Sequence, residues 1–403
     1  MEKVEPRPAP PSDIFTRVGA IDLLRALTMV LMIFVNDLWS LRDIPAWLEH
    51  VPRGVDGIGL ADVVFPAFLF IVGMSLPFAI DGRRAKGDSD LQLVRHVIGR
   101  SVALLVMGVF FVNGETINAA TGMDAVIWNA VCCIAFILIW NAYPKVMPVW
   151  MQRSLKVLGI TMLLALAFIY RGGDDGHLVR FAPHWWGILG LIGWSYLVTA
   201  LMTIFARGRL DILIGAWVAF SLLSLVWAAE LVPTPLHSIP EPIIDGTMTA
   251  LSLGGVVIAR LFQIFRNKNE NLRMTFVFAV IAVLLICLSL YTRQFWGLSK
   301  LAATPAWLFL CSAFTLMAFM VLYWLSDIAR KEHWFNPVKR AGTDTLLCYL
   351  IPSFLYLAMD MVQLELPDPL LTGGLGLIKS LLFALICVWV TGGLGKLGIR
   401  LRL

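Results

Sequence analysis

Long, uninterrupted apolar segments recur along the whole 403-residue chain and limit what it can fold into. Runs of roughly 18–22 such residues are each long enough to cross about 30 Å of hydrocarbon as a helix. The composition agrees, because 59% of the residues are hydrophobic and only 15% are charged, whereas soluble domains contain about 25% charged residues. A membrane β-barrel is excluded, because its strands alternate apolar and polar residues. The sequence therefore predicts an all-α, polytopic integral membrane bundle of about 10–12 transmembrane helices, with candidate spans at residues 19–41, 59–80, 94–113, 124–142, 154–170, 185–205, 211–230, 247–265, 274–292, 305–326, 343–362 and 374–395.

The basic residues are distributed unevenly between alternate loops. If the first span starts in the cytoplasm, 24 of the 32 Lys and Arg residues lie on the cytoplasmic side and six on the other. Because positively charged loops stay in the cytoplasm, both termini are expected there. Residues 1–16 are polar and Pro-rich, so we expect a cytoplasmic N-terminal tail rather than a cleaved signal peptide. Residues 17–403 are expected to form a single transmembrane domain, because the loops are short.

The cysteines give no sign of a disulfide framework or a metal site. All six fall inside apolar runs, and none is spaced with a histidine as zinc ligands are. We therefore expect buried, small apolar side chains with no disulfide and no metal.

Three polar side chains stand close together at the first two apolar segments. Asn36 closes the first segment, His50 lies in the connecting loop, and Asp62 lies one turn into the second. Polar groups at membrane depth are costly and often mark a functional site, and a histidine beside an amide suggests proton transfer and carbonyl polarisation. Each residue also has a plainer interpretation: Asn36 as an interhelical hydrogen-bonding group, His50 as an exposed loop residue, and Asp62 as a cap of the second helix.

Asp22, Arg25 and Asn36 share one face of the first helix. At about 100° per residue, Arg25 and Asn36 differ by some 20° in azimuth, and Asp22 by about 40°. The face carries a charged pair at its cytoplasmic end and an amide roughly 16 Å further along. This arrangement suits a long ligand that enters from the cytoplasm with its anionic end held inside. The alternative is an Asp22–Arg25 ion pair that reaches the lipid headgroups.

The loops expected outside hold four of the six histidines. One of these, His184, directly precedes Trp185 and Trp186, whose indole rings suit stacking on a sugar. The alternative is an aromatic belt at the membrane interface.

Several motifs in the first part of the chain resemble a known family. RVGAIDLLRAL (17–27), Asn36, His50 and GIGLADVVFPAFLFIVGMSL (57–76) are similar to the heparan-α-glucosaminide N-acetyltransferase family and its bacterial relatives. The opening motif is shared more loosely with other transmembrane acyltransferases, whereas the ADVVFPAFLFIVG block is far more specific. The loop after His50 departs from the family pattern, because it is longer and has Val55 where the family has an aromatic residue. Fainter similarity extends over residues 186–197 and 336–350.

This resemblance implies a reaction that the residue spacing alone does not give. Acetyl-CoA enters from the cytoplasm as cosubstrate, and its acetyl group passes to the amine of a glucosamine-containing sugar on the far side of a bacterial inner membrane. The chain would then act in the lipid bilayer as a multi-pass acyltransferase, with a homodimer as a possible assembly and no nucleic-acid partner.

The resemblance also assigns roles to residues. The family's catalytic histidine corresponds to His50 and its paired asparagine to Asn36. His50 would take the proton of the sugar ammonium, and Asn36 would donate to the oxyanion of the thioester carbonyl. Asp62 would orient His50 or hold the substrate amine. We expect the sugar to contact Asp62, His184, Trp185 and Trp186, and acetyl-CoA to contact Asp22, Arg25 and Arg340.

Other functions remain open at this point. A covalent acetyl-histidine intermediate is an alternative to direct transfer, and a periplasmic glycan hydroxyl is an alternative acceptor for the same base. A multi-pass sugar transporter has a similar helix count, with Asp62, Arg260 and Asp344 as pathway residues. Transporters, however, often show repeated halves with broken helices, and no such repeat is evident in the sequence.

Overall fold

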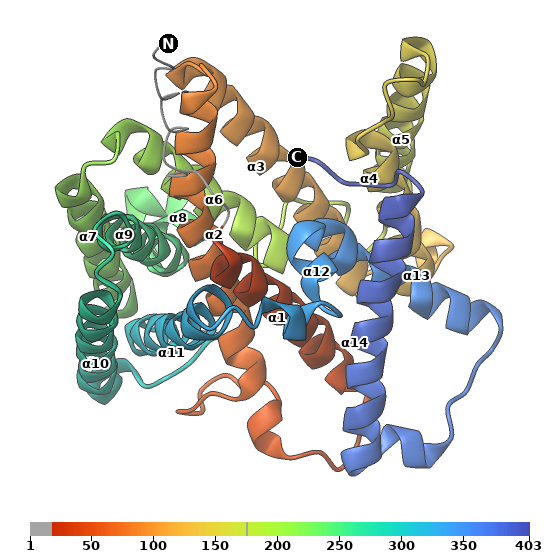
Figure 1. The fold of residues 1–403 in the computed structure, drawn as a ribbon. Coiled ribbons are helices and arrows are strands. Elements are labelled where there is room, and N and C mark those ends of the chain that lie inside the picture. Colours follow the sequence, from red (N-terminus) through yellow and green to blue (C-terminus); the bar gives the residue numbers. More distant parts are fainter. Residues whose placement is uncertain (1–17, 175) are drawn as a thin grey trace, which may run out of the picture.

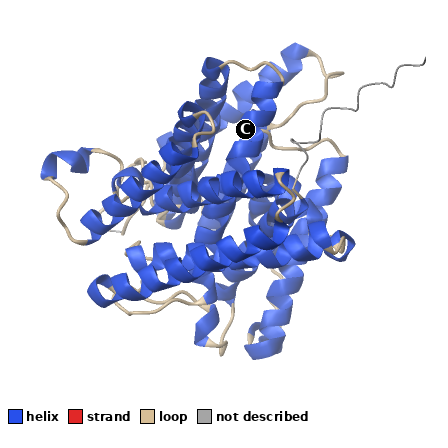
Figure 2. Ribbon diagram, turned by 60° about the vertical axis from the view of Figure 1, so that its left-hand side comes forward, coloured by secondary structure: helices blue, strands red, loops and turns tan. Residues whose placement is uncertain are grey.

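The computed structural model describes residues 18–174 and 176–403 and shows a bundle of helices (Figure 1). Loops of different lengths join the helices (Figure 2), and pairing of extended backbone within the described residues is limited to isolated β-bridges. The expected N-terminal tail, residues 1–16, lies outside the described residues. The prediction of an all-α, polytopic membrane bundle is confirmed. The helices are α1 (Gly19–Asp37), α2 (Leu60–Ala85), α3 (Asp90–Glu115), α4 (Ala125–Trp140), α5 (Val149–Ile169), α6 (Ile188–Ala206), α7 (Leu210–Ala228), α8 (Glu241–Ile244), α9 (Thr247–Asn267), α10 (Asn271–Trp296), α11 (Pro305–Tyr323), α12 (Lys339–Thr343), α13 (Thr345–Met361) and α14 (Gly373–Lys396).

Each of the candidate spans coincides with one of these helices. Within the described residues, ten helices are long and apolar enough to cross a membrane. The helices α4 and α13 are apolar but shorter, with 16 and 17 residues. At 1.5 Å per residue each is about 25 Å long, a little less than the hydrocarbon thickness of about 30 Å.

Contacts between helix ends and between loops show which ends of the helices lie on the same side of the bundle. At one end the amide of Ala142 donates to the carbonyl of Arg400, and Arg84 donates to the carbonyl of Ile204. We call this the basic end, because its loops hold most of the Lys and Arg residues. At the opposite end, the His50 end, the amide of Gly57 donates to the carbonyl of Leu298, and the loops 38–59, 116–124, 297–304 and 362–372 lie there. In Figure 1 the segment between α1 and α2 lies at the lower edge of the molecule.

The helices differ in how much of their surface is buried. The most buried spans are α1, α2, α3 and α9, whereas only 17–28% of the residues of the spans α5, α7, α10 and α14 are buried. Each exposed helix still contains an 18-residue window with at most two charged residues, as expected for helices that face lipid. The inner helices α2 and α9 come very close together, because a Cβ added at Gly73 would lie 1.8 Å from the carbonyl oxygen of Ser252. Small residues permit this close packing in membrane proteins.

Five of the six cysteines are buried, as expected, but Cys287 is exposed on α10. The expectation of burial is wrong there, because α10 presents an apolar face outward and a small apolar residue on that face needs no protein partner.

Candidate active site

His50 and Asp62 form a hydrogen-bonded pair at the His50 end. Nδ1 of His50 lies 2.6 Å from Oδ1 of Asp62. The Asp62 side chain is 1% exposed, whereas that of His50 is 46% exposed. Because a carboxylate only accepts hydrogen bonds, Nδ1 carries the hydrogen and Nε2 is left free to accept a proton. The pair therefore presents an oriented imidazole base at an accessible position.

Asp62 also joins the residue after His50 to the last residue of the same loop. Its Oδ2 accepts hydrogen bonds from the amides of Val51, at 3.0 Å, and Gly59, at 3.1 Å. Gly59 precedes the first residue of α2, and a Cβ there would lie 1.9 Å from the carbonyl oxygen of Glu49. The backbone of the loop therefore folds back on itself at a position that only glycine accommodates. Asp62 closes this loop as the third residue of the helix, which is a common place for a capping carboxylate.

A second loop, residues 297–304 between α10 and α11, holds the His50 loop from the other side. Asp56 accepts from Nε of Arg293, at 3.0 and 3.1 Å, and from the amide of Leu298, at 2.8 Å. The Leu298 hydrogen bond, helped by Arg293, lowers the pKa of Asp56. Nζ of Lys300 lies 3.3 Å from Nδ1 of His50 and 4.0 Å from Oδ1 of Asp62. From the sequence Lys300 is only one of the loop charges, because 250 residues separate it from His50.

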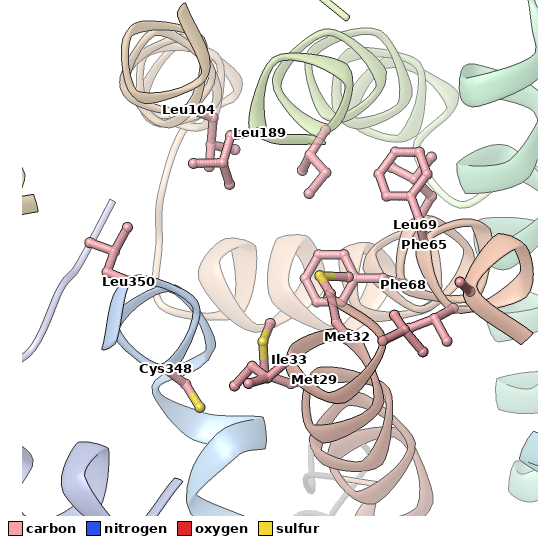
Figure 3. Close-up of a cluster of buried hydrophobic side chains, with 14 of the residues drawn as sticks. Met29, Met32, Ile33, Phe65, Phe68, Leu69, Leu104, Leu189, Cys348 and Leu350 are labelled. Carbon is pink, nitrogen blue, oxygen red and sulfur yellow. The ribbon is translucent and has the colours of Figure 1, made fainter. Parts of the chain in front are cut away.

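A cavity of about 600 Å³ lies between α1, α2, α3, α6, the segment that joins α12 to α13, and the last residues of the chain. Figure 3 shows its inner wall, where Met32 and Phe68 lie opposite Leu104 and Leu189. Toward the basic end the wall is charged. The acidic and basic side chains that line it are Asp22, Arg25, Arg83, His96, Arg100, Asp344 and Arg402.

The face of α1 that the sequence singled out forms part of this wall. Asp22, Arg25, Met29 and Met32 all line the cavity, and they follow each other at spacings of three and four residues. Asn36 is the next position in the same series, one turn beyond Met32, and it is exposed. The structure therefore brings Asp22 and Arg25 into one cavity and places Asn36 on the same helical face, toward the His50 end.

Arg25 joins three segments of the chain at the wall of the cavity. Its guanidinium donates to Oδ1 of Asp22 at 3.3 Å, to Oγ of Ser75 at 2.6 Å and to the carbonyl of Gly342 at 3.1 Å. Much of its hydrogen-bonding capacity is thus used within the protein. Arg25 therefore forms the ion pair with Asp22 that the sequence suggested, and it also lines the cavity.

The remaining candidate residues lie beside these features. Arg340 is exposed on α12, with its Cγ near the position of a Cβ at Gly392, while Gly342 on the same short helix lines the cavity. His184 and Trp186 are exposed in the coil before α6, and Trp185 packs edge-on against Trp194. The first residues of α6, Ile188 and Leu189, line the cavity. In the sequence, the two tryptophans therefore come just before residues that line the cavity.

A buried ion pair next to Asn36 was not expected from the sequence. Asp37 accepts from the hydroxyl of Tyr356 at 2.6 Å and from Nζ of Lys379 at 2.8 Å, and Lys379 also donates to Ser40 at 2.8 Å. The side chains of Asp37 and Lys379 are 3% and 16% exposed. The available signal was that both charges lie in apolar segments, because such charges usually have a partner. This network ties the end of α1 to α13 and α14.

The residues named for a transport pathway have different surroundings. Asp62 pairs with His50, and Arg260 forms an ion pair with Asp81 of α2 and donates to Gln263 at 2.8 Å. Asp344 lines the cavity.

Comparison with known proteins identifies similar chains. Heparan-alpha-glucosaminide N-acetyltransferase of Mus musculus is 34% identical over 101 residues, and that of Homo sapiens is 30% identical over 101 residues. Each match covers 24% of this chain and only 14% of the relative's length. The resemblance seen in the sequence is therefore confirmed for a part of the chain.

A family model described as "Domain of unknown function (DUF5009)" matches residues 17–231. This segment includes Asp22, Arg25, Asn36, His50 and Asp62, whereas Lys300 lies beyond it. Because the matched residues make up more than half of the 403-residue sequence, the chain belongs to the DUF5009 family.

Proposed function

We propose that the protein is a transmembrane acetyltransferase. It transfers the acetyl group of acetyl-CoA, bound from the basic end, to the amine of a glucosamine-type sugar at the His50 end. The observation that carries the proposal is the pairing of the accessible His50 with the buried Asp62, because an imidazole held in one tautomer is suited to general-base catalysis. The reaction class comes from the names of the two N-acetyltransferase relatives.

The cavity is the proposed site for acetyl-CoA. Its arginines at the basic end suit the phosphate groups of the cosubstrate, and its apolar wall suits the uncharged arm that carries the thioester. Since Arg25 already binds Asp22, Ser75 and Gly342, we assign phosphate binding mainly to Arg83, Arg100 and Arg402. Arg25 and Asp22 then form the part of the wall along which the uncharged arm of acetyl-CoA passes, and Arg340 lies at the edge of the cavity.

The proposed chemistry uses few groups. Nε2 of His50 takes a proton from the sugar ammonium, and the freed amine attacks the carbonyl carbon of the thioester. The carbonyl oxygen becomes an oxyanion, to which the amide of Asn36 donates. The intermediate collapses as the carbon–sulfur bond breaks, and the departing thiolate takes up the proton from the imidazolium. The nitrogen of the new amide releases its second proton to water, so the products are the N-acetylated sugar, the CoA thiol and one proton. Attack by Nε2 itself, through an acetyl-histidine, is a second route through the same residue.

The sugar is proposed to bind near the coil before α6. Trp186 is 54% exposed there and offers a stacking surface, while Trp185 and His184 flank it. Asp62 is fully engaged by His50 and two backbone amides, so its proposed role is to orient His50. The single transmembrane domain, residues 17–403, would lie in a bacterial inner membrane with the basic end in the cytoplasm.

The test is transfer of label from acetyl-CoA to glucosamine by the purified protein in detergent. We expect transfer by the wild type and a loss of at least about 10²-fold in His50→Ala, since a general base contributes roughly 10²–10⁴-fold. His237→Ala is the matched control, because His237 is an exposed histidine in another loop of the same end and should keep wild-type activity. If the label appears only on an O-acetylated glycan, the acceptor is a hydroxyl group and not an amine. Absence of both transfer and acetyl-CoA binding would overturn the proposal.

A further inference from the structure

The α10–α11 loop reaches the candidate active site from a part of the chain that the family match does not cover. The matched segment ends at residue 231, and Lys300 lies in residues 297–304. Its side chain is 21% exposed, which is low for a lysine in a loop. Burial lowers the pKa of Lys300, and the nearby carboxylate of Asp62 offsets part of this effect. A buried ammonium ion is costly, so its position beside His50 calls for a physical reason.

The contacts of the loop show that this position is fixed. Asp56 binds both Arg293 and the amide of Leu298, and the amide of Gly57 donates to the carbonyl of Leu298 at 2.9 Å. On the other flank, Nε1 of Trp307, at the start of α11, donates to the backbone carbonyl of Asp62 at 2.9 Å, and Trp307 is fully buried. The segment around Lys300 is therefore attached to the His50 loop before the lysine and to the first turn of α2 after it.

We propose that Lys300 is a positioning residue of the acetyl-transfer site, whose ammonium group opposes the charge of Asp62 and keeps the imidazole of His50 neutral and ready to accept a proton. This inference rests on the proposed function. Asp62 alone would favour the imidazolium form, which is no base, because an opposite charge favours the charged state. A cation at 3.3 Å from Nδ1 counters that preference. After the proton transfer the same cation favours release of the proton to the departing thiolate.

The other charged or titratable groups near this site do not contact the imidazole of His50, so the charges that act on it at close range are those of Asp62 and Lys300. Asp56 and Arg293 neutralise each other in their own ion pair. The thiol of Cys311, from α11, lies near both Asp62 and Lys300 and is buried. Of the described charges, Asp62 and Lys300 are those in contact with the imidazole.

The test compares Lys300→Met with Lys300→Arg in the full chain, purified in detergent and checked for a single size-exclusion peak. Loss of the charge removes the group that opposes protonation of the imidazole, so the acid limb of kcat/KM should move to higher pH by at least about one unit, which a charge at this distance would cause even at the dielectric constant of water. Lys300→Arg should restore the limb. Arg180→Met is the matched control, since it removes an exposed cation from another loop of the His50 end, and its limb should stay at the wild-type pH.

A second readout does not depend on turnover. Diethyl pyrocarbonate reacts with the neutral form of imidazole and not with the imidazolium form. Mass spectrometry of the peptide that contains His50 gives the rate of modification of His50 as a function of pH. We expect the midpoint to shift upward in Lys300→Met by the same amount. An unmoved midpoint and an unmoved acid limb would overturn the role of Lys300, even if the wild type transfers acetyl groups. If the midpoint shifts but no form transfers acetyl groups, the proposed function fails while the charge balance around His50 stands.

Discussion

Substitution of Asp62 by Asn separates the electrostatic part of the candidate site from its scaffold. Asp62 uses one oxygen for Nδ1 of His50 and the other for the amides of Val51 and Gly59. An asparagine has a single acceptor oxygen, and two backbone donors compete for it on one side. The amide oxygen should therefore face Val51 and Gly59, which turns the NH₂ group toward His50.

This arrangement reverses the tautomer of the imidazole. Nδ1 must then accept a hydrogen bond, so the hydrogen moves to Nε2, and the nitrogen that faces the substrate no longer accepts a proton. Loss of the correctly oriented base costs on the order of 10²–10⁴ in rate. The fold should change little, because both backbone donors keep an acceptor. In Asp62→Ala the same amides lose their acceptor, which adds about 1–3 kcal/mol of destabilisation for each buried group.

The assay measures kcat and kcat/KM for label transfer from acetyl-CoA, with the thermal midpoint and acetyl-CoA affinity of each variant as controls. We expect Asp62→Asn to lose activity at nearly wild-type stability, and Asp62→Ala to lose both. Activity of Asp62→Asn within about threefold of the wild type would refute the reasoning, because the tautomer argument requires a loss of at least about 10²-fold.

Three further outcomes follow from the same contacts. Arg100→Gln should weaken acetyl-CoA binding about tenfold and reduce its salt dependence, because a charge-assisted hydrogen bond contributes roughly 1.5 kcal/mol; an unchanged Kd would remove the phosphates from this part of the cavity. Lys379→Met should destabilise the protein in detergent by about 3–5 kcal/mol, because it leaves Asp37 as an uncompensated buried charge, and the addition of Asp37→Asn should recover part of the loss. Burial raises the pKa of Asp245 to about 7, above its value in the unfolded chain, so its contribution to stability is complete below about pH 4 and is lost as the pH rises through 7. Asp245→Asn, which keeps an acceptor for the amide of Thr247, should therefore raise the thermal midpoint at pH 8.5 but not at pH 4.

The helices could be predicted from the sequence because their signal is local. A run of apolar residues of membrane length needs no knowledge of its neighbours, and every candidate span coincides with a helix. The shared face of α1 is local too, since Asp22, Arg25 and Asn36 follow helical spacing. The closeness of His50 and Asp62 was suggested by a separation of only 12 residues.

Contacts between distant segments could not be predicted in this way. His50 and Lys300 are separated by 250 residues, and Asp37 and Lys379 by 342. Periodicity and spacing indicate which face of a helix is polar, but they do not say which other helix lies against it. The cavity could not be predicted for the same reason, because its wall is formed by distant segments of the chain, namely α1, α2, α3, α6 and the C-terminal region.

These distant contacts bear on how the two ends of the bundle work together. The loop of His50 is held by Asp62, at Val51 and Gly59, and by the α10–α11 loop, at Asp56 and Gly57, so both halves of the chain fix the position of the base. The Asp37–Lys379 pair fixes the last turn of α1, which carries Asn36, against α14. Since α1 also lines the cavity through Arg25 and Met32, it connects the arginine-lined wall to the His50 end, as α2 does through Arg83 and Asp62. A rigid α1 would keep a bound thioester, Asn36 and His50 in register, because a misplacement of about 1 Å costs on the order of 10² in rate. The C-terminal half therefore contributes to the proposed reaction by holding these groups, although the groups themselves come from the segment that defines the family.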